Sequence, residues 1–321
     1  MKTPDLTDVA SASQRLQGQV HRTPVMTSTS LNETVGAELF FKCENFQRTG
    51  SFKLRGAMNT TLQLSNDVRT VVTHSSGNHG AALALAATAC GKKAMVVVPK
   101  GARPEKRSAI ERLGAEIVDC EEDLADREAV LAKVMASQPE AAFVPPYDHA
   151  DIVAGQGTAA LELVEEVGGL DQLWVPVGGG GLAAGTTIVA NGQMDIVCAE
   201  PELARDAHDS LTTGELQPAM PPCTVADGLR TALGKLNFEI LRKSSVAVVL
   251  VDDEAILTAM RLIWNRLKIV VEPSAAVCLA AMLLDTKRVA ARTGVILSGG
   301  NISPPHNKPA TRWRLRDFLV C

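Results

Sequence analysis

Short apolar runs alternate along the chain with longer segments whose apolar residues recur roughly every three to four positions. The apolar runs predict strands at 39–42, 71–73, 94–98, 116–118, 173–177, 196–199, 246–251 and 295–297. The longer segments predict helices at 52–63, 79–90, 104–113, 124–136, 157–167, 253–267 and 274–284. Because the strands lack a polar face, they indicate mostly parallel sheets covered by helices on both sides. The pattern therefore predicts an α/β fold.

One domain boundary is visible in the same pattern. Residues 70–147 form a compact run of strand and helix pairs that ends at Val144-Pro-Pro-Tyr147. We expect a small domain at 70–147, inserted in a larger domain made of 1–69 and 148–321. A chain of 321 residues is long enough for two such lobes.

Composition narrows the range of functions. Hydrophobic residues make up 46% of the chain, which supports a large core without disulfides or metals. Aromatic residues make up 3% and the net charge is -4, so we expect no nucleic-acid partner. The seven cysteines form no close pairs, which indicates reduced thiols and argues against zinc.

Targeting signals are not expected. Residues 1–8 are polar, unlike the start of a signal peptide. No apolar stretch approaches the roughly 20 residues of a membrane span, so we expect no membrane partner. The prediction is a cytoplasmic protein that acts on a small molecule.

The first sequence with catalytic potential is Thr49-Gly-Ser-Phe-Lys-Leu-Arg-Gly56. It places Lys53 near the start of a predicted helix. A desolvated lysine there has a lowered pKa and becomes a nucleophile for an aldehyde. The alternative is an ordinary solvated residue in the first turn of a helix.

A second sequence, His74-Ser-Ser-Gly-Asn-His-Gly80, connects a predicted strand to a predicted helix. Small, hydroxyl-bearing residues at such a turn expose backbone N–H groups at the positive end of the helix dipole, which suits a carboxylate. The alternative is a simple helix cap made by Ser75 or Ser76, with His79 on the surface.

Four consecutive glycines occur in Val177-Gly-Gly-Gly-Gly-Leu-Ala-Ala-Gly185, directly after a predicted strand. Such a run is costly in chain entropy and is best explained by backbone wrapped around an anion, above all a phosphate. Gly178, Gly180 and Ala183 also satisfy the dinucleotide pattern G-x-G-x-x-A, and Glu200 ends the next strand. A nicotinamide-dependent oxidoreductase is therefore an alternative at this point.

The fourth sequence is Leu297-Ser-Gly-Gly-Asn301, which again follows a strand. A dinucleotide site leaves this turn, Lys53 and Ser75 without a role. A pyridoxal phosphate site uses all four sequences: lysine for the aldehyde, glycines for the phosphate, serine for the ring nitrogen and a turn for the substrate carboxylate. We therefore interpret the chain as a pyridoxal phosphate enzyme acting on a small amino acid.

With these motifs in this order, the sequence resembles the fold-type II pyridoxal phosphate enzymes. Within them it is similar to the branch of serine racemases, serine and threonine dehydratases and 3-hydroxyaspartate dehydratases. The motifs that carry the resemblance, besides the four above, are His21-Arg-Thr-Pro24, Phe41-Lys-Cys-Glu44, Ile152-Val-Ala-Gly-Gln-Gly-Thr158, Val225-Ala-Asp-Gly228 and Val271-Glu-Pro-Ser274. The resemblance implies two open, twisted, mostly parallel sheets covered by helices, as in the tryptophan synthase β subunit. It also implies a homodimer.

The resemblance further implies roles for individual residues. Lys53 would hold the cofactor as a Schiff base, with Phe52 against the ring. Asn78 would bond the 3′ oxygen and Ser298 would face the pyridine nitrogen. The phosphate would lie on the glycines Gly178, Gly179, Gly180 and Gly181. The substrate carboxylate would lie among Ser75, Ser76, Asn78 and His79.

The chemistry implied by the resemblance is β-elimination. The freed Lys53 amine would remove the Cα proton, and a serine beside the ring nitrogen would favour prompt loss of a β-hydroxyl. Hydrolysis then gives a keto acid and ammonia. Ser76, on the opposite ring face, would exchange the Cα proton and allow racemisation or use of D-substrates. The alternative is that Ser76 only binds the carboxylate.

Two further sites follow from the resemblance. Glu200, the Ala204 carbonyl and Asp206 match the divalent-cation site of serine racemase-like enzymes, and these oxygen ligands suit Mg²⁺ or Ca²⁺. Arg127 falls where an arginine fork reaches a second carboxylate of the substrate. His74 and Tyr147 are weaker candidates for the same task. The alternatives are a charged helix entrance at 200–206 and a solvated helix face at Arg127.

The sequence also departs from parts of the family. Ala81 stands where mammalian serine racemases carry glutamine, so their nucleotide activation is not expected here. Nothing after Asn301 is long enough for the regulatory domain of biosynthetic threonine dehydratases, so isoleucine feedback is not expected either.

We predict a pyridoxal phosphate-dependent ammonia-lyase for serine, threonine or 3-hydroxyaspartate, with serine racemase activity. Ser76, Arg127 and Tyr147-Asp-His149 favour 3-hydroxyaspartate. The alternatives are an enzyme that is primarily a serine racemase, a β-replacement synthase of the cysteine synthase type, a nicotinamide-dependent oxidoreductase and a non-catalytic amino-acid-binding protein.

Overall fold

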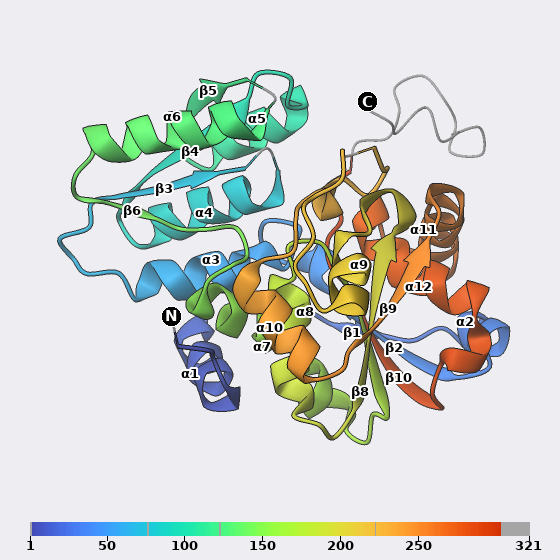
Figure 1. The fold of residues 1–321 in the computed structure, drawn as a ribbon. Helices are drawn as coiled ribbons and strands as arrows, with labels where there is room; N and C mark the ends of the chain where they lie inside the picture. The colour runs from blue at the N-terminus through green and yellow to red at the C-terminus, as the bar shows by residue number, and fades with distance from the viewer. Residues whose placement is uncertain (1, 76, 122, 222, 303–321) are drawn as a thin grey trace.

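The computed structural model describes residues 2–75, 77–121, 123–221 and 223–302. Within these ranges the strands form two separate sheets, each flanked by helices (Figure 1). One sheet has six strands in the order β1-β2-β10-β7-β8-β9, and the other has four in the order β5-β4-β3-β6. The predicted α/β fold with two mostly parallel sheets is therefore confirmed.

The six-stranded sheet forms the larger lobe of the molecule. Its strands are β1 (Val25–Met26), β2 (Glu38–Cys43), β7 (Gln172–Pro176), β8 (Asp195–Pro201), β9 (Ala247–Val251) and β10 (Arg292–Leu297). All neighbouring strands run parallel except β1 and β2. Because the carboxyl ends of parallel strands share one edge of the sheet, the turns after β7 and β10 come together there.

Helices cover both faces of this sheet. One face carries α2 (Thr29–Val35), α11 (Asp253–Leu267) and α12 (Pro273–Leu284). The other face carries α1 (Leu6–Leu16), α7 (Ala150–Val167), α8 (Gly181–Ala190), α9 (Asp206–Thr213) and α10 (Lys235–Lys243). Short 3₁₀ helices lie at η1 (Glu44–Phe46), η2 (Glu202–Ala204), η3 (Asp227–Leu229) and η4 (Thr286–Arg288).

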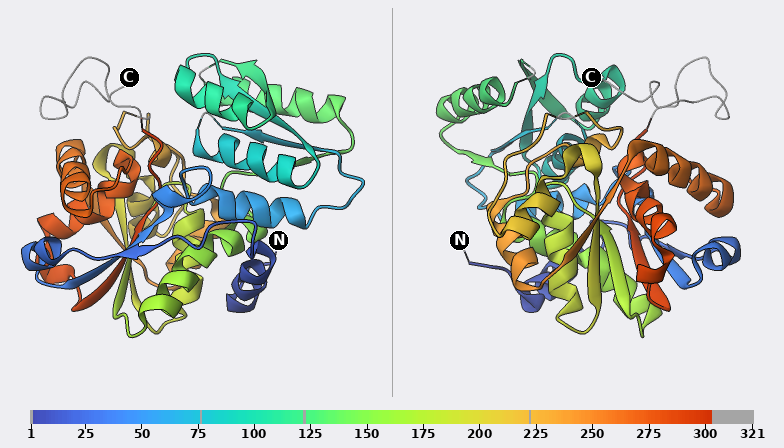
Figure 2. Two further views of the ribbon diagram at one scale, coloured as in Figure 1. Left: turned by 180° about the vertical axis from the view of Figure 1, so that it is seen from behind. Right: turned by 45° about the vertical axis from the view of Figure 1, so that its right-hand side comes forward.

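The four-stranded sheet forms a smaller lobe beside the first (Figure 2). Its parallel strands are β3 (Thr70–His74), β4 (Lys93–Pro99), β5 (Ala115–Cys120) and β6 (Ala141–Phe143). Helices α4 (Asn78–Ala89) and α5 (Pro104–Arg112) cover one face, and α6 (Leu124–Ser137) covers the other. Helix α4 also packs on α3 (Lys53–Leu62), which connects the two lobes.

The predicted strands and helices are all present, with boundaries shifted by a few residues in most cases. Helix α7 is the largest difference, because it begins at Ala150 rather than 157. Its glycines mark close crossings of helices and not the start of a helix. A Cβ on Gly155 would lie 2.7 Å from the Arg55 carbonyl oxygen, and a Cβ on Gly157 would lie 3.0 Å from the Gly185 carbonyl oxygen. Elements β1, β6, α1, α2, α8, α9 and α10 were not predicted.

Two further expectations concern thiols and membranes. Cys43, Cys90, Cys120, Cys198 and Cys278 are free thiols, as expected. Cys223 is disulfide-bonded, so the expectation of reduced thiols is wrong at this position. None of the helices in the described ranges combines the length and the apolar character that crossing a membrane requires.

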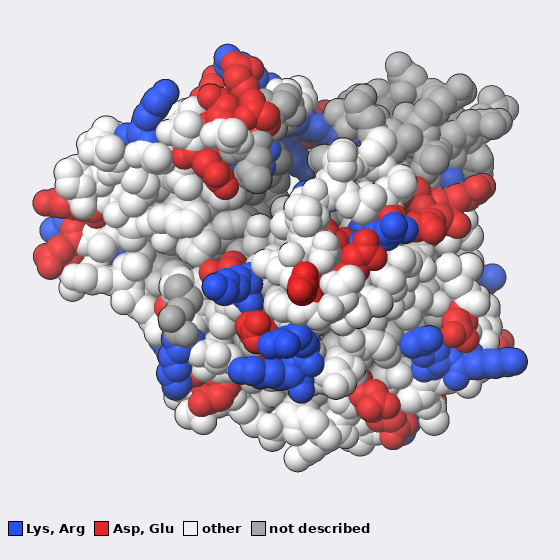
Figure 3. Space-filling model, in the orientation of Figure 1, with Lys and Arg blue, Asp and Glu red and all other residues white. Residues whose placement is uncertain are grey.

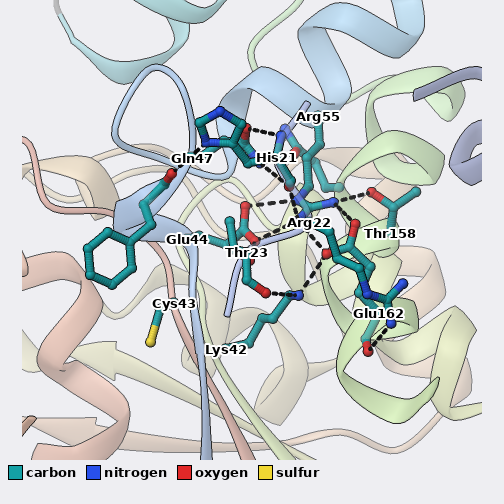
Figure 4. Close-up of polar contacts among 12 residues, drawn as sticks. His21, Arg22, Thr23, Lys42, Cys43, Glu44, Gln47, Arg55, Thr158 and Glu162 are labelled. Atoms are coloured by element: carbon teal, nitrogen blue, oxygen red, sulfur yellow. Dashed lines mark hydrogen bonds and ion pairs between the residues drawn. The ribbon is translucent and has the colours of Figure 1, made fainter. Parts of the chain in front are cut away.

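A buried ion network joins α3 to the larger sheet (Figure 4). The Arg55 guanidinium donates to both oxygens of Glu44, at 2.8 Å each, and to both oxygens of Glu162, at 2.7 and 2.8 Å. The Lys42 ammonium lies 2.7 Å from Glu162 and donates to the Thr23 carbonyl oxygen. The charged side chains are at most 10% exposed. Two cations and two carboxylates therefore balance each other without help from water.

This network predicts a large effect for one substitution. In Arg55→Met, two carboxylates and Lys42 stay buried without their main partner, so we expect the free energy of unfolding to fall by about 3 to 5 kcal/mol. Urea denaturation measures this change. The matched control is Arg22→Met, which removes an exposed ion pair with Glu165 and should cost less than about 1 kcal/mol. Equal losses in the two variants would contradict the prediction.

Candidate active site

Lys53 is the first residue of α3 and lies between the two lobes. Its ammonium donates to the Pro146 carbonyl oxygen at 2.8 Å and lies 5.1 Å from the centre of the Phe52 ring. Burial lowers the pKa of the Lys53 amine to about 8, although the Glu272 carboxylate opposes this shift. The amine is therefore much more available as a nucleophile near neutral pH than an ordinary lysine.

The turn after β3 leads into α4 close to this lysine. The Ser75 hydroxyl accepts a hydrogen bond from the Gly77 N–H at 3.2 Å, which fixes the turn. The first N–H group with an intrahelical acceptor is that of Ala81, which bonds the Gly77 carbonyl oxygen. The N–H groups of the first helical turn are thus available to an anion. Ser76 lies outside the described residues.

His79 is buried in α4, and its side chain has a defined protonation state. Burial, together with the charge of Lys53, lowers the pKa of His79 to about 3, so the imidazole is neutral. Its Nε2 lies 3.1 Å from the Val144 carbonyl oxygen, which can only accept, so the proton is on Nε2. The buried Nδ1 is then an acceptor. Of the groups on His79, only the backbone N–H is suited to binding a carboxylate.

The four glycines form the turn between β7 and α8. Gly180 has φ +86°, a conformation that side-chain-bearing residues rarely adopt. A Cβ on Gly179 would lie 2.4 Å from the Tyr147 ring, so this position has no room for a side chain. The Gly179 carbonyl oxygen accepts hydrogen bonds from Asn237 Nδ2 at 2.6 Å and from the Gly234 N–H at 3.1 Å. With that carbonyl held, the N–H groups at the start of α8 form a phosphate-sized cradle.

Tyr147 and Ser298 complete the surroundings of Lys53. The Tyr147 ring packs on the glycine turn, and its centre lies 5.9 Å from the Lys53 ammonium. Ser298 follows β10, is 3% exposed, and its carbonyl oxygen accepts the Phe52 N–H at 3.0 Å. The structure therefore brings the lysine, the glycine turn and the serine turn to one edge of the larger sheet.

Glu272 is a site residue that the sequence analysis did not identify. It caps α12 in the quoted motif Val271-Glu-Pro-Ser274, and its Oε1 accepts a hydrogen bond from Asn78 at 2.8 Å. Asn78 in turn accepts from Asn301 at 2.9 Å. Burial raises the pKa of Glu272 to about 7, and the nearby Asp227 charge adds to the shift. The only signal in the sequence was an acidic residue just before a helix-starting proline.

A cavity of about 470 Å³ lies between the lobes next to this carboxylate. Gly77, Asn78 and Lys106 line it from the smaller lobe, and Asp227 and Glu272 line it from the larger one. Lys53 is not part of its lining.

Arg127 projects from α6 toward the end of β3 and not along the solvated face of the helix. Its charge acts on His74, on Tyr147 and on the Cys120 thiol, with which it also forms a hydrogen bond. His74 stacks on Phe143 with ring centres 5.8 Å apart. The structure thus places a cation at the same end of the smaller sheet as the turn that starts α4, although α6 and α4 cover opposite faces.

Glu200 and Asp206 form a second group of buried carboxylates. Glu200 accepts backbone hydrogen bonds from Ala207 and His208 at the start of α9, and Asp206 accepts from Leu233 at 2.7 Å. Burial raises the pKa of Glu200 to about 9 and that of Asp206 to about 6. Glu200 is fully buried, so it does not offer the ribose contact that a dinucleotide site requires.

Comparison with known proteins agrees with this geometry. Residues 16–299 match the family described as pyridoxal-phosphate dependent enzymes. The chain is 44% identical to a serine racemase of Dictyostelium discoideum, over 94% of this chain and 96% of the relative. It is 42% identical to a beta-hydroxyaspartate dehydratase of Paracoccus denitrificans, over 94% of this chain and 98% of the relative.

A solved structure shows the same likeness in three dimensions. The crystal structure of the serine racemase from Dictyostelium discoideum superposes with a TM-score of 0.89, at 42% identity, over 94% of this chain and 100% of that one. The prediction of a fold-type II enzyme is confirmed, and the dinucleotide alternative is not supported. The chain belongs to the family of pyridoxal-phosphate dependent enzymes.

Proposed function

We propose that this chain is an ammonia-lyase for small β-hydroxy amino acids, that 3-hydroxyaspartate is its favoured substrate, and that it also racemises serine. The observation that carries this proposal is that the turn between β3 and α4, with the free N–H groups that start α4, lies within reach of two cations. Besides burial, the charge of Lys53 lowers the pKa of His79 at the start of α4, and the charge of Arg127 lowers the pKa of His74 at the end of β3. A dicarboxylate with an amino group between its carboxylates has groups that match all three.

The residues around Lys53 fit pyridoxal phosphate. The α8 cradle at Gly178, Gly179, Gly180 and Gly181 suits the phosphate, and the Lys53 amine suits the aldehyde. Phe52, Asn78 and Ser298 would hold the ring, its 3′ oxygen and its nitrogen. When bound, the cofactor supplies the electron sink that acidifies the Cα proton of an amino acid.

Side chains and backbone groups of the chain itself would remove the proton and bind the substrate. Lys53 Nζ takes the Cα proton, which a neutral amine of lowered pKa can do near neutral pH. The N–H groups of Asn78 and His79, with Ser75, bind the α-carboxylate. Loss of the β-hydroxyl as water and hydrolysis of the remaining imine yield a keto acid and ammonia.

The proposed preference for 3-hydroxyaspartate rests on Arg127. An arginine fork binds a carboxylate with two charge-assisted hydrogen bonds, which serine and threonine cannot use. The similarity to a protein named beta-hydroxyaspartate dehydratase supports this choice. The similarity to a protein named serine racemase supports the second activity, for which we propose Ser76 as the acid or base on the opposite face.

We also propose a divalent-cation site at Glu200, Asp206 and the Ala204 carbonyl. Two adjacent buried carboxylates with raised pKa values are costly when ionised, and a cation would remove that cost. Each Glu200 oxygen that accepts a backbone N–H keeps a lone pair for a metal. Oxygen ligands of this kind favour Mg²⁺ or Ca²⁺.

The remaining proposals concern organisation. We propose that residues 70–147 act as a small domain that closes over the substrate, against a large domain of 1–69 and 148–321. We further propose a homodimer and a cytoplasmic location, for which the five free thiols are the supporting observation.

Substrate choice is tested by ammonia release from L-serine, D-serine, L-threonine and the threo and erythro isomers of 3-hydroxyaspartate. In Arg127→Met we expect KM for the preferred 3-hydroxyaspartate isomer to rise about 10- to 100-fold, because one charged hydrogen-bonding partner is lost. KM for L-serine should change less than about threefold. Lys133→Met, an exposed cation on the same helix, is the matched control.

Other outcomes of this assay decide between the alternatives. Equal KM increases for serine and 3-hydroxyaspartate would contradict the role of Arg127. Ammonia release only after sulfide is added would favour a β-replacement synthase. Interconversion of serine enantiomers without ammonia release would favour a racemase, and no turnover at all would leave only amino-acid binding.

The Lys53 pKa predicts how cofactor binding depends on pH. Only the neutral amine attacks an aldehyde, so the rate of pyridoxal phosphate uptake by the apoenzyme should rise about tenfold per pH unit and level off near pH 8. An ordinary lysine would level off only near pH 10.4. Stopped-flow absorbance measures this rate. In Glu272→Gln the plateau should begin at lower pH, because the opposing carboxylate is gone. An uptake rate that still rises tenfold per pH unit at pH 9 would exclude a desolvated Lys53.

The cation site predicts metal-dependent stability. In chelator-treated protein, saturating Mg²⁺ or Ca²⁺ should raise Tm by about 5 °C. Glu200→Gln should abolish this increment, whereas Glu202→Gln, an exposed neighbour, should keep it. Differential scanning fluorimetry measures the effect without relying on catalysis. An unchanged increment in Glu200→Gln would exclude this site.

A further inference from the structure

Lys106 makes an ionic contact between the two lobes. It lies on α5 of the smaller lobe, and its ammonium forms an ion pair with Asp227 in η3 of the larger lobe. The two side chains are only 21% and 30% exposed. Because the pair is partly shielded from water, its attraction is stronger than that of an exposed surface pair.

The same side chain lies against the start of α4. A Cβ on Gly77 would stand 3.5 Å from Lys106 Nζ and 3.7 Å from its Cδ. Gly77 is the N-cap residue of α4, so the Lys106 side chain packs on the backbone that begins this helix. One ammonium group therefore joins the carboxylate-binding end of α4 to Asp227 of the other lobe.

The charges around Asp227 keep this contact ionic. Burial alone would raise the pKa of Asp227, but Lys106, Arg103 and Arg230 together hold it below its ordinary value. Asp227 in turn contributes to the raised pKa of Glu272. Lys and Arg side chains are visible in the hollow between the lobes in Figure 3. Asp227 is therefore ionised at neutral pH.

The start of α4 has a second contact with the larger lobe, through hydrogen bonds of the Asn78 amide. Asn78 donates to Glu272 and accepts from Asn301. Amide hydrogen bonds fix direction, but they weaken quickly when the groups separate. The Lys106 ion pair acts over a longer distance, so it is the contact that can draw the lobes together.

We propose that Lys106 and Asp227 form an ionic anchor that places the start of α4 over Lys53, so that Lys106 is a positioning residue for the reaction. This inference rests on the function proposed above. Without the anchor, substrate binding must supply the free energy that brings the lobes together. KM then rises, whereas kcat for bound substrate is nearly unchanged.

A double-mutant cycle on the holoenzyme tests the proposal. We expect Lys106→Met and Asp227→Asn each to raise KM about tenfold for every substrate turned over, with kcat within about twofold. The double variant should be no worse than the worse single variant. Lys106→Arg keeps the charge and should stay within about threefold of the wild type. The matched control is Lys100→Met with Glu121→Gln, an exposed pair within the smaller lobe.

Small-angle X-ray scattering provides a readout independent of turnover. Loss of the anchor should increase the radius of gyration of the holoenzyme, and Lys106→Arg should restore the wild-type value. Additive KM increases in the double variant, or a raised KM with unchanged scattering, would overturn the proposal and make Lys106 a direct ligand of the substrate. If the wild type releases no ammonia from any substrate, the proposed function fails, and scattering alone still decides whether the anchor exists.

Discussion

The position of Lys53 depends on a buried arginine two residues further along the same helix. Arg55 holds the carboxylates of Glu44 and Glu162, and through them ties α3 to η1 and α7. None of these charges is well solvated, so none can leave without exposing another to an apolar environment. The network therefore fixes α3 in one place and leaves the Lys53 side chain free to face the space between the lobes.

Burial also sets the protonation states around that space. It lowers the pKa values of Lys53 and His79 and raises that of Glu272, so each group favours its neutral form. Fixed charge remains in the ion pair between Lys106 and Asp227, where the two charges balance each other. The proposed anionic cofactor and substrate would then meet mainly backbone N–H groups.

The sequence predicted the fold well because its signals are local, whereas the role of Lys53 stays a prediction. Buried parallel strands read as continuous apolar runs, and the four glycines of 178–181 have few explanations other than an anion. Glu272, Lys106 and Asp227 were not identified because their importance arises from contacts across distant segments. Helix α8 was missed because its glycine-rich start lacks helix-forming residues, and α7 was shortened because its glycines looked like a boundary. The alternative that His79 lies on the surface is wrong, because its side chain is buried and its Nε2 donates to the Val144 carbonyl oxygen.

The glycine contacts of α7 have a consequence for how such a scaffold can change. Gly155 allows α3 to cross α7, and Gly157 with Gly185 allows α8 to cross it. The helix that bears Lys53 and the helix that begins at the glycine turn therefore both pack closely on α7. A larger residue at Gly155 would displace α3, and one at Gly157 or Gly185 would displace α8, so each would move one side of the proposed cofactor site. In the smaller lobe, α4 packs on α3 and α5 carries Lys106, whereas α6 packs on the outer face of the smaller sheet. A library that explores altered specificity should accordingly hold α7, α4 and α5 constant and randomise positions on α6.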